Sequence, residues 1–180
     1  MAWIWRLPIH PRIQLFLWKL MWDRLPTCSL LADRGSPISP LCPICGIQEE
    51  TAEHAILTCS RAVRTWQLLH YTPWISEEGP TRILLLHASI QHGPCYQGIH
   101  SAYLASYIWL TRNQAVFANE VISPQVIHRT ATSMATEYVR SLSLVFTLTN
   151  LASGTPLLLR QRTVLRSLSL GSPHPRVTSK

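Results

Sequence analysis

Three cysteines and one histidine, gathered within 18 residues, are the side chains of this sequence best suited to chemistry. They follow the spacing C-x2-C-x8-H-x4-C and are Cys42, Cys45, His54 and Cys59. A CxxC turn can direct two thiolates at one ion, and Cys3His is a ligand set of tetrahedral, structural zinc. Four protein ligands leave no open position for a substrate or an activated water. The spacing predicts one Zn²⁺ in a closed structural site, the alternative being a reduced, metal-free cluster in a degenerate copy.

Short elements must position these ligands. Gly46 follows the CxxC turn and allows the backbone to turn without a Cβ clash. Thr51 can cap the turn that carries His54, and three glutamates nearby favour a helix N-terminus. These acids are Glu49, Glu50 and Glu53. Arg61 and Arg64 can offset the formal charge of −1 on zinc with three thiolates and one neutral imidazole.

Caps and periodicity predict helices on both sides of the cluster. Pro11 begins a helix that runs through Trp22, and Thr27 caps a short helix that ends at Gly35. Ser60 caps another helix, while proline-rich breaks fall at 36–41 and 73–80. Three later helices are expected at 81–90, 98–119 and 124–147.

The fold class predicted is mostly α with irregular loops. With 180 residues, 20.4 kDa and 47% hydrophobic residues, the chain is long enough for one packed domain and an appendage. We expect a small zinc-stabilised domain over 1–72, a helical extension over 81–148 and a flexible, disordered basic tail over 149–180.

The charge is unevenly distributed. The formal net charge is +7 and the sequence pI is about 9.6, which suits a polyanionic partner. Residues 1–75 carry seven cations and five acids, residues 76–150 carry four of each, and residues 151–180 carry five cations and no acid. The tail is interpreted as a solvated C-terminus, with a nucleic-acid arm as the alternative.

The sequence does not favour an enzyme. Two-metal nucleases and polymerases need several converging carboxylates, and the second half of the chain offers Glu120 and Glu137 and little else. No G-x-S-x-G nucleophile motif and no glycine-rich phosphate loop occurs. Cys28 and Cys95 lie outside the ligand spacing and are read as ordinary thiols.

No run of about 20 apolar residues suggests a membrane span, and no secretory signal is recognised. We therefore expect an intracellular protein of the nucleus or cytoplasm, neither secreted nor bound to a membrane, whose cysteines are reduced.

These motifs, in this order, resemble the zinc-binding domain of plant non-LTR retrotransposon reverse transcriptases. The similarity is strong over residues 3–70, where it includes the helix with Phe16-Leu17-Trp18-Lys19-Leu20, the turn Arg24-Leu25-Pro26-Thr27 and the ligand cluster. It continues weakly through a W-x-x-RN-x-x-x-F stretch from Trp109 to Phe117. The resemblance implies a retroelement-derived accessory domain. We expect neither the upstream polymerase region nor the downstream ribonuclease H region of that family in this chain.

Resemblance and charge together favour binding of RNA or single-stranded DNA. Arg12, Lys19 and Arg24 are the predicted phosphate contacts. Five aromatic residues interleave with the cations and could stack on unpaired bases, or they could form the core around the zinc site. They are Trp3, Trp5, Phe16, Trp18 and Trp22.

Two other interpretations remain open. The chain could be a zinc-stabilised structural module that contacts proteins, including other retroelement-derived proteins, through apolar helical faces of its neutral middle region. It could also be a remnant without function.

Overall fold

The structure, a computed structural model, describes residues 2–69, 86, 90 and 95–152. This part of the chain is mostly helical, which confirms the predicted fold class, and its only β pairing is an isolated antiparallel bridge between Leu41 and Glu49. Three sequence-based expectations lie largely or wholly outside it: the 81–90 helix, the break at 73–80 and most of the basic tail.

The N-terminal third is built from short helical elements joined by ordered turns. Their bounds are η1 Ile4–Arg6, α1 Pro11–Met21, α2 Cys28–Asp33, the π-helical η2 His54–Thr58 and α3 Ser60–Trp66. The predicted caps are present at α2, where the Thr27 hydroxyl accepts the Leu30 N–H and Gly35 follows with φ +83°. At α3 the N-cap is Cys59 rather than Ser60, which is the first helical residue.

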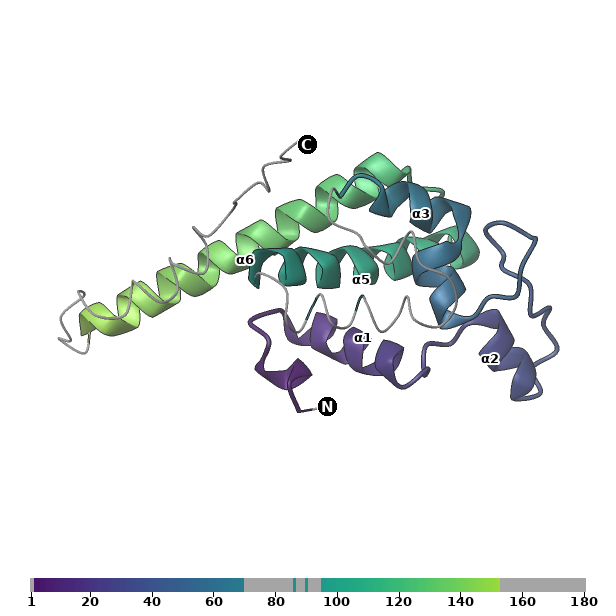
Figure 1. Ribbon diagram of the computed structural model, residues 1–180, viewed down its shortest axis with the longest axis horizontal. Helices are drawn as coiled ribbons and strands as arrows, with labels where there is room; N and C mark the ends of the chain where they lie inside the picture. Colours follow the sequence, from purple (N-terminus) through teal and green to yellow (C-terminus); the bar gives the residue numbers. More distant parts are fainter. Residues whose placement is uncertain (1, 70–85, 87–89, 91–94, 153–180) are drawn as a thin grey trace, which may run out of the picture.

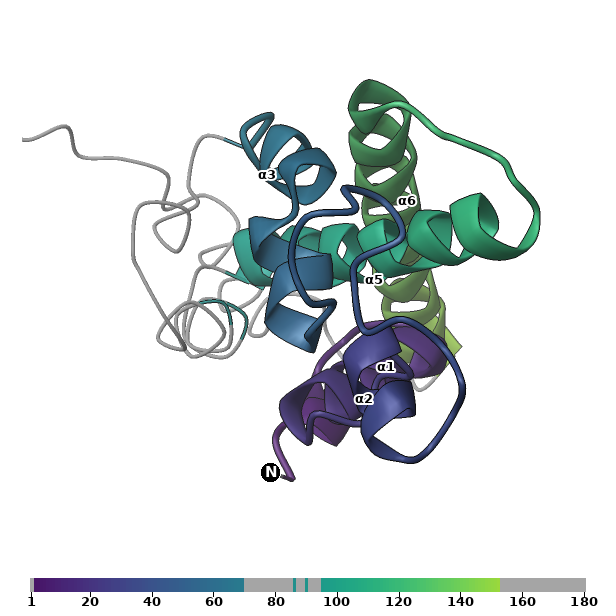
Figure 2. The same cartoon turned by 90° about the vertical axis from the view of Figure 1, so that its right-hand side faces the viewer.

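Two long helices complete the fold. They are α5 Cys95–Phe117 and α6 Pro124–Ala152, so α6 extends four residues into the segment expected to form the tail. Figures 1 and 2 show α5 in the centre, with α1 along one side, the η2–α3 segment on another and α6 crossing it. The C-terminal half of α6 projects beyond the other described elements (Figure 1).

One hydrophobic core joins these elements. It runs without interruption from Ile4 in η1 through the cysteine cluster and α5 to Ala135 in α6. The inner face of α1 contributes residues at helical spacing: Ile13, Phe16, Leu17 and Leu20. The described residues of the predicted zinc-binding segment and of the helical extension therefore share one core, while the predicted boundary between them lies outside the described residues. The described residues contain no helix long and apolar enough to cross a membrane.

Candidate metal centre

The structure brings together the four residues that the sequence spacing singled out. The ligand atoms of Cys42, Cys45, His54 and Cys59 all lie within 4.8 Å of one another. Cys42, His54 and Cys59 are buried, whereas Cys45 is partly exposed. These three cysteines and Cys28 are free thiols.

The first two ligands lie on a tight loop. The Cys42 N–H donates to the Gln48 carbonyl at 2.7 Å, and the Gly46 N–H donates to the Cys42 carbonyl at 2.8 Å. Gly46 has φ +68°, a left-handed conformation that L side chains adopt only with strain. This loop therefore depends on the glycine that the sequence analysis singled out.

The other two ligands lie at the two ends of a π turn. The Cys59 N–H donates to the His54 carbonyl at 2.8 Å, a bond across five residues. In an α-helix two residues five positions apart are rotated by about 140° around the axis, whereas a turn closed from i to i+5 brings them closer to one side. The π turn thus lets both side chains face the same point.

The imidazole of His54 is held on both sides. The backbone N–H of His54 donates to the Thr51 hydroxyl at 3.0 Å, which confirms the predicted cap. Nδ1 lies 3.2 Å from the Thr58 hydroxyl, and Nε2 lies 3.4 Å from Sγ of Cys45. A proton on Nδ1, donated to Thr58, leaves the lone pair of Nε2 directed at the cysteines, as a metal ligand requires.

The donor set fits a zinc ion. Tetrahedral zinc with bonds of about 2.3 Å to sulfur and about 2.0 Å to nitrogen places two sulfurs about 3.8 Å apart and sulfur and nitrogen about 3.5 Å apart. Sγ of Cys42 and Sγ of Cys59 are 4.0 Å apart, and the distance between Cys45 and His54 is 3.4 Å. Three sulfurs and one imidazole nitrogen are soft and borderline donors that suit zinc rather than magnesium or calcium.

The two buried thiols titrate differently. A hydrogen bond with Cys59, together with burial, raises the pKa of Cys42 to about 11. The same hydrogen bond lowers the pKa of Cys59 to about 7, against the effect of burial. A hydrogen bond with Cys42 raises the pKa of His54. At neutral pH the Cys42 thiol therefore holds a proton that an arriving metal ion must displace.

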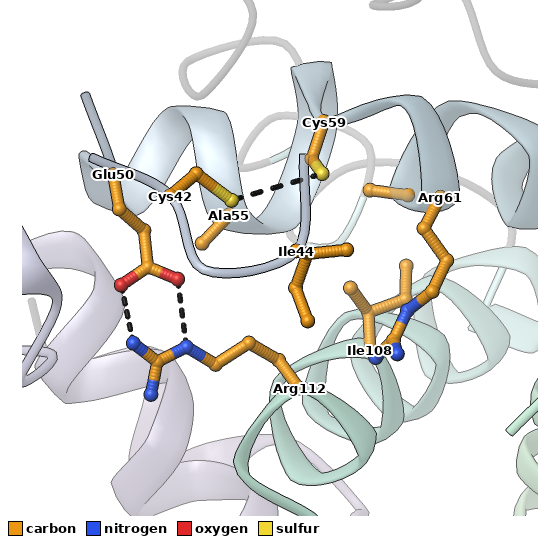
Figure 3. Close-up of a pocket in the computed structure, with 9 residues that line it drawn as sticks. Cys42, Ile44, Glu50, Ala55, Cys59, Arg61, Ile108 and Arg112 are labelled. Atoms are coloured by element: carbon orange, nitrogen blue, oxygen red, sulfur yellow. Dashed lines mark hydrogen bonds and ion pairs between the residues drawn. The ribbon is translucent and has the colours of Figure 1, made fainter. Parts of the chain in front are cut away.

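A small cavity connects the cluster to α5. Figure 3 shows Cys42, Cys59 and Arg61 on its wall together with Glu50 and Arg112. The Arg61 guanidinium donates through Nη2 to the Thr111 hydroxyl at 3.1 Å, and its pKa is lowered by burial. Of the two arginines expected to offset the charge of the zinc site, Arg61 lines this cavity, whereas Arg64 is exposed.

Sequence reasoning missed the role of Glu50, which it grouped with the acids of a helix N-terminus. Glu50 is fully buried and forms an ion pair with Arg112 of α5, whereas its neighbour Glu49 is exposed. The available signal was the Arg-Asn pair of the W-x-x-RN-x-x-x-F stretch, because Arg112 is the only Lys, Arg, Asp or Glu residue of α5 and a buried arginine needs an anionic partner.

The predicted phosphate contacts lie apart from the ligand cluster in the chain. Arg12 and Lys19 are exposed on α1, and Arg24 is exposed in the turn after it, where its N–H donates to the Lys19 carbonyl at 2.7 Å. One exposed strip along α1 and its C-cap residue, which we call the outer face, carries five residues at helical spacing: Arg12, Leu15, Trp18, Lys19 and the C-cap Trp22.

The aromatic residues divide between the two roles considered for them. Phe16 belongs to the core, and the partly buried Trp3 packs against that core. Trp5, Trp18 and Trp22 are 52%, 36% and 53% exposed. Cys28 begins α2 outside the cluster, with its pKa raised to about 11 by burial and by Glu50, while the side chain of Cys95 lies outside the described part.

Comparison with known proteins gives one finding. Residues 1–66 match a protein family described as zinc-binding in reverse transcriptase. No curated protein and no solved structure matches the chain. The matched segment contains all four residues of the cluster, the outer face of α1 and all of α3.

Proposed function

We propose, from the premise that residues 1–66 are the zinc-binding domain of a reverse transcriptase, that this chain is a retroelement-derived accessory module. In this proposal Cys42, Cys45, His54 and Cys59 hold one Zn²⁺ as a structural ion, and the module binds RNA or single-stranded DNA. The plant non-LTR origin is part of the proposal and rests on the sequence resemblance. The module carries no catalytic role, because four protein ligands close the metal site.

The outer face of α1 is the observation that supports nucleic-acid binding. Trp18 and Trp22 are one helical turn apart and both are exposed, so their indoles offer two faces on which unpaired bases can stack. Arg12 and Lys19 lie on the same strip and can contact phosphates. Asp23 beside Trp22 is the acid nearest in sequence, and the net charge of +7 favours a polyanion.

The test is binding of the full chain to a fluorescent single-stranded RNA at several salt concentrations. Affinity should fall steeply as salt rises, and Arg12→Gln with Lys19→Gln should reduce the slope of log K against log salt by about 1 to 2, since about 0.7 ions are released per phosphate contact of a single strand. Arg34→Gln, which removes one exposed cation from the loop after α2, is the control. Binding no stronger than that of a neutral protein would contradict the proposal.

Exposed Leu15, one helical turn before Trp18 on the outer face of α1, favours a second candidate, a surface that contacts another retroelement protein. In that case Leu15→Ser would abolish association with the partner while leaving RNA affinity unchanged. Loss of RNA affinity in Trp18→Ala and Trp22→Ala would favour the nucleic-acid interpretation instead.

A further inference from the structure

A buried ion pair joins the loop of the metal site to helix α5. Arg112 donates from Nε to Oε1 of Glu50 at 2.7 Å and from Nη2 to Oε2 of the same carboxylate. The two side chains are 5% and 0% exposed, and 62 residues separate them in the chain. Figure 3 shows the two parallel contacts at the edge of the cavity that Cys42 and Cys59 also line. This two-point geometry fixes the orientation of the carboxylate as well as its position.

Glu50 lies between the two halves of the ligand set. Its backbone N–H donates to the Pro40 carbonyl at 2.9 Å, which closes the loop that carries Cys42 and Cys45. The next residue, Thr51, accepts the His54 N–H and so starts the π turn. Contacts that fix the position of Glu50 therefore also fix the loop with Cys42 and Cys45 relative to the turn with His54 and Cys59.

Further contacts from two elements, α2 and α5, hold the pair in place. Oε2 of Glu50 also accepts the Cys28 N–H at 2.8 Å, from the first turn of α2. Arg112 donates from Nη1 to the Asn113 side chain at 3.0 Å, and its guanidinium carbon lies 5.1 Å from the centre of the Trp109 ring. Each of these contacts restricts the positions that the guanidinium or the carboxylate can adopt.

A role in stability alone does not explain this arrangement well. Two buried charges cost so much solvation that a hydrophobic pair of similar volume is often as stable. Residues that orient the ligands of a metal, in contrast, need fixed directions, and their loss typically costs ten- to hundredfold in metal affinity.

We propose that Arg112 and Glu50 are positioning residues of the zinc site, and that α5 is part of the metal-binding unit although it lies outside the matched segment 1–66. This inference rests on the proposed zinc site. In this inference Arg112, in the Arg-Asn stretch of α5, fixes the loop between Cys45 and His54 through Glu50.

The experiment measures zinc release from the full chain into excess chromophoric chelator. Arg112→Lys keeps the charge but loses the two-point contact, and Glu50→Gln keeps the shape but loses the charge. Each should release zinc at least tenfold faster than the original chain at the same pH. Should Glu50→Gln fail to fold, as circular dichroism would show, Arg112→Lys alone decides the outcome.

The matched control is Ile13→Ala, which removes a buried side chain of α1 that does not line the cavity. It should lower the thermal midpoint and leave the release rate unchanged. Wild-type release rates in Arg112→Lys and Glu50→Gln, or equal acceleration in Ile13→Ala, would overturn the positioning role while leaving the zinc site intact. An original chain without zinc would overturn the proposed site itself, and this inference with it.

Discussion

Nε2 of His54 lies 3.4 Å from Sγ of Cys45, while Nδ1 of the same ring lies 3.2 Å from the hydroxyl of Thr58. His54 and Thr58 are the first and last residues of η2, so the same turn carries both the ring and the hydroxyl. One ring nitrogen thus faces the cysteines and the other is held by a residue of the same turn. These two contacts within the protein orient the imidazole without a bond to a metal ion.

Removing the Thr58 hydroxyl should weaken zinc binding. In Thr58→Val the ring loses the partner of Nδ1, and the zinc dissociation constant should rise about tenfold. The control Thr136→Val removes a hydroxyl that is bonded only to its own helix, at Thr132. Competition with a chelator of known affinity measures both, and equal dissociation constants for Thr58→Val and the original chain would show that Thr58 does not orient the ligand.

Gly46 should be needed for zinc binding, whereas Gly35 should not. Both have positive φ, and open space surrounds the Cβ that alanine would add at either position. Each alanine variant should therefore lose about 1–2 kcal/mol of folding free energy through backbone strain alone. Only Gly46→Ala distorts the loop that carries Cys42 and Cys45. If urea unfolding shows matched losses but zinc affinity falls equally in Gly35→Ala, the loop has no special role.

Zinc uptake should release protons near neutral pH. The pKa of Cys42 is raised to about 11, so this thiol is protonated at pH 7 and must lose its proton to bind. The thiol of Cys59, with a pKa of about 7, contributes a further fractional proton. Because protons compete with the metal, zinc affinity should fall as the pH is lowered from 8 to 6. Calorimetry in two buffers of different ionisation enthalpy measures this, and identical heats would contradict it.

The sequence was sufficient to predict the ligand cluster as a group, because metal ligands must lie close together and their spacing is local. It also predicted where α1 begins and where α2 begins and ends, since Pro11, Thr27 and Gly35 act on their own backbone; α1 ends at Met21, one residue before the predicted end at Trp22. The N-cap of α3 was misplaced by one residue, because the π turn ends at the residue before Ser60.

The ion pair between Glu50 and Arg112 could not be predicted from local sequence patterns, because its partners lie 62 residues apart. Nothing in the spacing of Glu49, Glu50 and Glu53 indicates which of the three is buried, since that depends on where α5 places Arg112. The exposure of Trp18 and Trp22 likewise follows from which side of α1 faces α5. The predicted phosphate contacts, the domain boundaries and the tail stay predictions.

Zinc content tests the central claim most directly. Native mass spectrometry of the full chain, purified under reducing conditions, should show one zinc per chain, and Cys45→Ser should show none. Chelation should then unfold the zinc-binding segment cooperatively, because structural zinc contributes on the order of 10 kcal/mol in small zinc domains. Freshly prepared chain without zinc, or a circular dichroism spectrum that chelation leaves unchanged, would contradict the account.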